Sequence, residues 1–147
     1  MLLSSRFQQF CRDLHTEAML ELIRGVPAPY QVILQRAWAT GRFLDRGNPT
    51  AGNLGSDFAR LGMDFWTNVY ALHTHNQRRR ALLDELMEWR NAIGHQDFRN
   101  KPLLQGQTEI GLGRVQQFRR SCGALATYFD QAVLAHIHAV GGTNLGW

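Results

Sequence analysis

Arg90, Asn91 and His95 are the residues of this chain whose types and spacing are best suited to chemistry. A guanidinium stays charged and can hold a phosphate through two parallel hydrogen bonds, whereas an imidazole ordinarily exchanges a proton near neutral pH. An amide beside them can orient either group or a substrate. Such side chains together can hold a phosphate and transfer protons at it.

Their mutual position depends on where the helix that carries them ends. Apolar residues recur there at steps of four, three and four, which predicts one buried helical stripe of Leu82, Leu86, Trp89 and Ile93. Gly94 is the residue type that commonly takes a left-handed backbone just past a helix end. We therefore predict a helix from about 78 to 93. A stop at Gly94 would bring Arg90 and His95 side by side, whereas an unbroken helix would hold them about 140° apart.

The rest of the chain predicts further helices, because apolar residues recur at helical steps between Gly and Pro breaks. The predicted helices cover residues 5–24, about 29 to the break at 47–49, 50–62, 64–72 and 114–140. Gly41 weakens the second helix, and Asp64 can cap the fourth. We predict a turn or a weakened joint at 73–77 and an irregular loop at 97–113. These elements predict an all-α, up-and-down bundle of four main helices plus short pieces, a single domain over 1–147 with a frayed tail at 141–147.

Composition favours a globular protein in the cytoplasm. Hydrophobic residues make up 44% of the 147 residues and charged residues 19%. Cys11 and Cys122 lie within helical apolar patterns, so we expect buried free thiols in a reducing compartment. The N-terminus lacks the apolar core of a signal peptide, and no apolar run is long enough to span a bilayer. We therefore expect no membrane association.

The histidines do not predict a metal site. Two His-x-His pairs occur, His73 with His75 and His136 with His138, but residues two apart on a helix point about 200° apart. We interpret these four as exposed polar residues, and His15 as part of the polar flank of the first helix. A nucleotide-binding glycine motif and a Gly-x-Ser-x-Gly elbow are both absent from the sequence. We expect no metal and no cofactor.

The net charge of +4 is carried by arginine, since Lys101 is the single lysine among sixteen basic residues. A charge of this size points only weakly to nucleic acid. The run at 78–80 is either a solvated helix start or a phosphate-contact patch on the helix of Arg90 and His95. The candidate RNA-binding residues are Arg78, Arg79, Arg80, Arg99, Lys101, Arg119 and Arg120.

The segment from Arg90 to His95 resembles the Arg-x4-His signature of the HEPN superfamily, in which a polar residue follows the arginine. The flanking residues and three upstream segments resemble the HEPN group associated with RiboL-PSP proteins, and the likeness covers about residues 6–140. The upstream segments are Asn48-Pro49-Thr50, Phe58-Ala59-Arg60-Leu61-Gly62 and Asp64-Phe65-Trp66. Some relatives carry a modified tyrosine two residues after the histidine, but Asp97 stands there, so that form of control is not expected.

The resemblance implies a small helical bundle that dimerises and cuts RNA without a metal, with Arg90 and His95 as the catalytic pair and Asn91 as the polar motif residue. It also implies a toxin or conflict-system role, with an antitoxin or other regulatory protein as a potential partner. Strand cleavage needs two proton-transfer groups, so a homodimer sharing one cleft would supply His95 twice. The alternatives are a HEPN-like module that binds RNA, nucleotide or a protein without cutting, and a purely structural dimerisation bundle.

Overall fold

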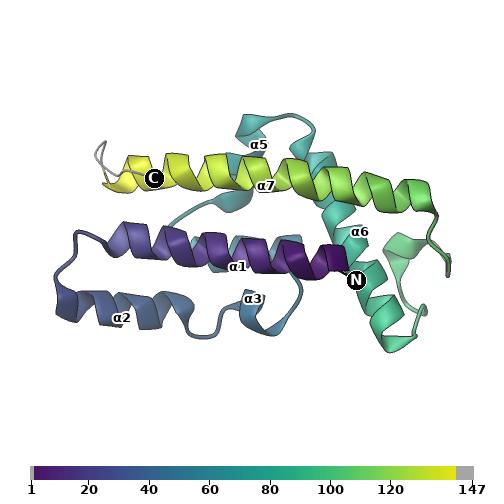
Figure 1. Cartoon of the computed structure of the whole chain (residues 1–147), viewed down its shortest axis with the longest axis horizontal. Helices are drawn as coiled ribbons and strands as arrows, with labels where there is room; N and C mark the ends of the chain where they lie inside the picture. The colour runs from purple at the N-terminus through teal and green to yellow at the C-terminus, as the bar shows by residue number, and fades with distance from the viewer. Residues whose placement is uncertain (1, 142–147) are drawn as a thin grey trace.

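The computed structural model describes residues 2–141, and every regular element in that range is a helix (Figure 1). The helices are α1 (Leu2–Ile23), α2 (Ala28–Ala39), α3 (Phe43–Arg46), α4 (Ala51–Ala59), α5 (Phe65–Leu72), α6 (Asn76–His95), the 3-10 helix η1 (Pro102–Leu104) and α7 (Leu112–Gly141). The predicted all-α bundle is confirmed. The frayed tail predicted at 141–147 lies, from residue 142 on, outside the described residues.

Two long helices form the centre of the bundle. Helices α1 and α7 lie side by side and run in the same direction, and α2 returns along α1 (Figure 1). Helix α6 is steeply inclined to this pair and packs against α7 near the start of α7. The far end of α6 therefore extends beyond the layer that α1 and α7 make.

An aromatic cluster fills the core beneath α1 and α7. Phe58 of α4 and Phe65 of α5 stack with ring centroids 4.3 Å apart, and Phe129 of α7 meets Phe65 edge-on at 4.7 Å. Phe7 of α1 lies 5.9 Å from Phe129. Each ring contributes about 1.5–3 kcal/mol by leaving water, so this cluster fixes α1, α4, α5 and α7 against one another.

The predicted second helix is wrong in one respect, because the chain breaks at Gly41. Gly41 has φ +77°, a left-handed backbone that separates α2 from α3. The short helix α3 is stabilised at its start by the buried carboxylate of Asp57. This carboxylate accepts hydrogen bonds from the backbone N–H groups of Phe43 at 3.0 Å and Leu44 at 2.8 Å. Helix α2 buries no residue, and Ile33, predicted for its inner face, is 62% exposed.

His15 is fully buried, which corrects its predicted place on a polar flank. Its Nδ1 lies 3.2 Å from Nη1 of Arg42, and its Nε2 lies 3.0 Å from the carbonyl oxygen of Asp57. A guanidinium only donates, so Nδ1 accepts and Nε2–H donates, which assigns a neutral imidazole. Burial is the main cause that lowers the pKa of His15, and the positive charge of Arg42 acts in the same direction.

Most other helix boundaries lie within a few residues of the predicted ones. Asp64 occupies the N-cap of α5, but its side chain makes no capping hydrogen bond, so the predicted cap is wrong in that detail. Cys11 and Cys122 are buried free thiols, as predicted. Within residues 2–141 no helix is both long and apolar enough to cross a membrane.

Candidate functional site

Helix α6 does not stop at Gly94, contrary to the prediction. It continues through His95, and Gln96 takes the left-handed backbone with φ 52°. The N–H of Asp97 donates to the carbonyl of Ala92 at 3.0 Å, and the N–H of Gln96 donates to that of Ile93. These two bonds form the Schellman closure that glycine usually makes, displaced by two residues.

This displacement changes the relation between the motif residues. Five positions of continuous helix place Arg90 and His95 about 140° apart around the axis, so one chain does not bring them side by side. Asn91 and His95 are one turn apart and share a side of α6. His95 is exposed and Arg90 is half-buried. Ile93 is 42% exposed, so the predicted buried stripe does not include it.

Asn91 is tied to a distant part of the chain. The side-chain amide of Asn48 donates to Oδ1 of Asn91 at 2.5 Å. Asn48 is buried beside α6, and its own Oδ1 accepts no hydrogen bond from the described residues. The carboxylate of Asp84 accepts the N–H of Ala51 at 2.8 Å, which anchors the start of α4 to the same side of α6. The segment 48–51 thus positions Asn91.

A second, smaller apolar cluster holds the end of α6. Trp89 and Ala92 pack with Leu104 of η1 and Phe118 of α7, and Phe98 lies against Trp89 with ring centroids 6.3 Å apart. This packing turns Trp89 inward and leaves His95, six positions on, in solvent. The chain after α6 therefore packs against the Trp89 side of the helix.

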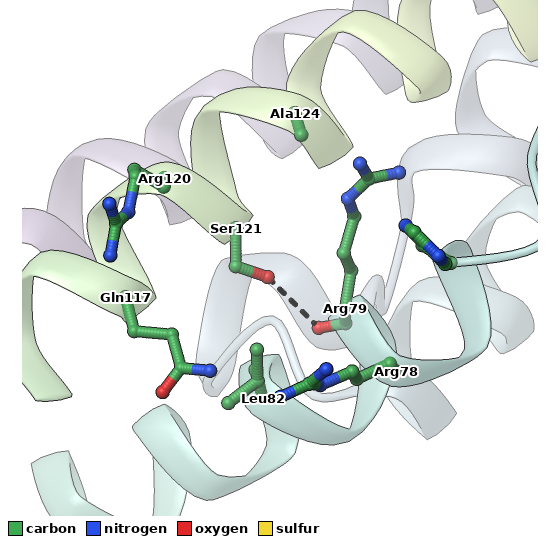
Figure 2. Close-up of a pocket in the computed structure, with 8 residues that line it drawn as sticks. Arg78, Arg79, Leu82, Gln117, Arg120, Ser121 and Ala124 are labelled. Atoms are coloured by element: carbon green, nitrogen blue, oxygen red, sulfur yellow. Dashed lines mark hydrogen bonds between the residues drawn. The ribbon is translucent and has the colours of Figure 1, made fainter.

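A basic hollow lies at the opposite end of α6, between α6 and α7 (Figure 2). We call it the arginine groove; its volume is about 210 Å³ and its lining is His75, Arg78, Arg79, Leu82, Gln117, Arg120, Ser121 and Ala124. The two walls are joined where the hydroxyl of Ser121 donates to the carbonyl of Arg79 at 3.4 Å (Figure 2).

The groove collects three of the seven predicted RNA-binding residues, namely Arg78, Arg79 and Arg120. The other four are placed elsewhere. Arg80 donates a hydrogen bond to the hydroxyl of Tyr70 and lies over the ring of Trp66. Arg99 forms an ion pair with Asp97, and Lys101 directly precedes η1. Arg119 is exposed on α7 but does not line the groove.

Along α6 the rise from Arg78 to Arg90 is about 18 Å, and from Arg78 to His95 about 25 Å, at 1.5 Å per residue. The motif and the groove are therefore two separate places on one helix. The described part of the chain holds no group of three or more His, Cys, Asp or Glu side chains that could bind a metal ion.

Comparisons of the chain with protein-family models, with curated proteins and with solved structures each gave no match.

Sequence reasoning missed Asn48 as a site residue. The sequence predicts a helix break at Gly47-Asn48-Pro49 and a family resemblance at Asn48-Pro49-Thr50, but neither assigns Asn48 a role at the site. The break is confirmed, because α3 ends at Arg46. One feature of the sequence could have identified Asn48. An asparagine between a glycine and a proline lies outside a helix, so its side-chain amide is available to form a hydrogen bond with another element.

Proposed function

We propose that this chain is an endoribonuclease of the HEPN type that cleaves RNA without a metal ion, with Arg90, Asn91 and His95 as its reacting and orienting groups. The observation that carries the proposal is the placement of this motif: an exposed imidazole in the last turn of α6, one turn from an amide held by Asn48. Exposure leaves room for a strand, and the Asn48 bond fixes the orientation of the amide.

The chemistry follows from the groups present. A base removes the proton of a 2′-hydroxyl, the 2′-oxygen attacks the adjacent phosphorus, and the bond from phosphorus to the 5′-oxygen breaks as an acid protonates that oxygen. The products are a 2′,3′-cyclic phosphate and a 5′-hydroxyl. His95 supplies an acid or a base, and the guanidinium of Arg90 stabilises the additional negative charge at phosphorus.

A second copy of the chain completes the site in this proposal. One chain provides one motif histidine, whereas the reaction transfers two protons. Arg90 and His95 also point to different sides of α6, so a two-fold pairing of α6 ends would set His95 of one copy against Arg90 of the other. Ile93, exposed about 60° around the axis from Arg90, offers apolar surface on the Arg90 side of that contact.

The test is a matched pair of substrates, one RNA and the same strand with a single 2′-deoxy linkage at the mapped cut. We expect cleavage of the RNA to a 2′,3′-cyclic end and none at the deoxy linkage. Cleavage at the deoxy linkage would contradict the mechanism.

The separation of Arg90 from His95 within one chain favours a second candidate, a HEPN-like module that binds RNA, nucleotide or a protein partner without cutting. Salt-dependent RNA binding that is unchanged by His95→Ala, with no cleavage, would select it. A toxin or conflict-system role, an antitoxin or other regulatory partner, and a cytoplasmic location belong to the same proposal and rest on the resemblance and the composition alone.

A further inference from the structure

We propose that the arginine groove binds the phosphodiester backbone of single-stranded RNA, as a site separate from the motif at the other end of α6. The inference rests on the proposed function in one respect, because the strand held in the groove would be the strand cut at His95. Its binding part can be tested without any cleavage.

The charge of the groove is the first reason. Three guanidinium groups, from Arg78, Arg79 and Arg120, line one hollow, and its eight lining residues include no carboxylate. The adjoining hollow along α6 shares Arg78 with it but contains Glu85, which forms an ion pair with Arg114. An anion therefore gains more from the arginine groove than from its neighbour.

The availability of the arginines is the second reason. Arg79 is held in place, since it donates to Oδ1 of Asn76 at 2.8 Å and lies 5.1 Å from the ring centroid of Tyr128. Arg78 and Arg120 are exposed, and neither forms a side-chain hydrogen bond or ion pair with the described residues. Two free guanidinium groups on facing walls are suited to bidentate contact with phosphate oxygens.

Planar rings beside the groove favour a nucleic acid over a simple anion. His75 lines the groove and its ring lies 5.0 Å from that of His73, which in turn lies 5.4 Å from the ring of Tyr128. Bases of a single strand stack on such rings while the backbone follows positive charge.

The distance between the groove and the motif sets a minimum length for an RNA strand that contacts both. About 25 Å of helix separates Arg78 from His95, so a dinucleotide at the motif cannot reach the groove, whereas a longer strand can contact both. Contacts at the groove should therefore strengthen the binding of long RNA substrates and leave that of a dinucleotide unchanged.

The experiment compares charge-matched variants. Arg78→Gln/Arg120→Gln removes the free groove cations. Arg36→Gln/Arg46→Gln removes two exposed arginines that neither line the groove nor belong to the predicted RNA-binding set, one on α2 and one on α3. Binding of a 2′-O-methyl RNA of about a dozen nucleotides is measured by fluorescence anisotropy over a range of salt concentrations. The 2′-O-methyl group prevents 2′-oxygen attack, so binding is read whether or not the chain is a nuclease.

We expect the groove variant to bind about tenfold more weakly or worse, with the slope of log affinity against log salt reduced by about 1.4, or about 0.7 for each lost phosphate contact. We expect the control variant to stay within about twofold of the parent chain. Full affinity in the groove variant, an equal loss in the control, or equal displacement of the RNA by poly-glutamate of similar length would overturn the assignment.

A kinetic comparison separates this inference from the proposed function. With an RNA of the same length the groove variant should raise KM, and with a dinucleotide it should leave kcat/KM unchanged. An equal effect on both substrates would contradict a separate groove. If no chain cuts either substrate, the proposed function fails, and the anisotropy result still decides whether the groove binds RNA.

Discussion

Asn48 and Asn91 are joined by a hydrogen bond of 2.5 Å between their side chains, although 43 positions separate them in the sequence. This bond connects the joint between α3 and α4 to the last turns of α6. It makes the orientation of a motif residue depend on the packing of a distant segment.

The bond predicts an energetic coupling between the two residues. In a double-mutant cycle of Asn48→Ala and Asn91→Ala, measured by urea unfolding, we expect a coupling energy of about 1 kcal/mol, because an intramolecular hydrogen bond contributes about 0.5–1.5 kcal/mol. The control cycle pairs Asn91→Ala with Gln131→Ala on the exposed side of α7 and should give a coupling near zero. Equal couplings in both cycles would contradict the contact.

The position of the left-handed residue at the end of α6 can be tested by substitutions at Gly94 and Gln96. Their effects on stability should be opposite to those expected if α6 ended at Gly94. Gly94 has a helical place in the structure, so Gly94→Ala should stabilise the chain by up to about 1 kcal/mol. Gln96 has a left-handed backbone, so Gln96→Gly should also stabilise it, by about 0.5–1 kcal/mol. Thermal unfolding of both variants is the measurement. A destabilised Gly94→Ala chain would place the left-handed residue at 94 instead.

The buried imidazole of His15 predicts a loss of stability in acid. Burial lowers the pKa of His15 in the folded chain, so the unfolded chain, with a histidine pKa of about 6.5, binds a proton first as the pH falls. The contribution of His15 is therefore complete above about pH 6.5 and decreases as the pH falls below it, toward the folded pKa.

Urea unfolding between neutral pH and mild acid measures this effect. The His15→Gln chain should be less stable near neutrality but should lose less stability on acidification than the parent chain. His138→Gln, an exposed position on α7, should retain the parental pH dependence. An unchanged pH dependence in His15→Gln would show that another group is responsible.

The two cysteines predict slow thiol chemistry in the folded chain. Burial raises the pKa of Cys122 to about 12 and raises that of Cys11 well above its ordinary value. Thiolate is the reactive form, so neither cysteine should react quickly with a disulfide reagent at neutral pH. Reaction of the native chain should be negligible over minutes and should reach two thiols per chain in urea. Rapid native labelling would contradict the burial.

Sequence patterns predicted the helices well because their signals are local. The steps between Phe118, Cys122, Leu125 and Phe129 define the inner face of α7 without knowledge of any other helix. The stop of α6 was predicted at the wrong residue because glycine is the usual local signal, whereas here the fold places the left-handed turn at Gln96.

The wrong prediction for His15 depends on distant partners. His15 was interpreted as a surface residue because a polar side chain on a helix is usually solvated, and only the arrival of Arg42 and Asp57 makes its burial favourable. The division of the predicted arginine patch has a local cause instead. Arg78 and Arg80 are two positions apart on α6 and point about 200° apart, so Arg80 contacts Tyr70 and Trp66 and does not line the groove.

The central claim is that His95 takes part in metal-independent cleavage of RNA. The most direct measurement is cleavage of RNA in EDTA by the parent chain, by His95→Ala and by His138→Ala, which removes an exposed histidine far along α7. Thermal unfolding of all three chains establishes equal folding. We predict cleavage by the parent and by His138→Ala, and a loss of at least about 100-fold in His95→Ala, as expected for removal of an acid–base group. Equal cleavage by His95→Ala, or no cleavage by the folded parent chain, would contradict the claim.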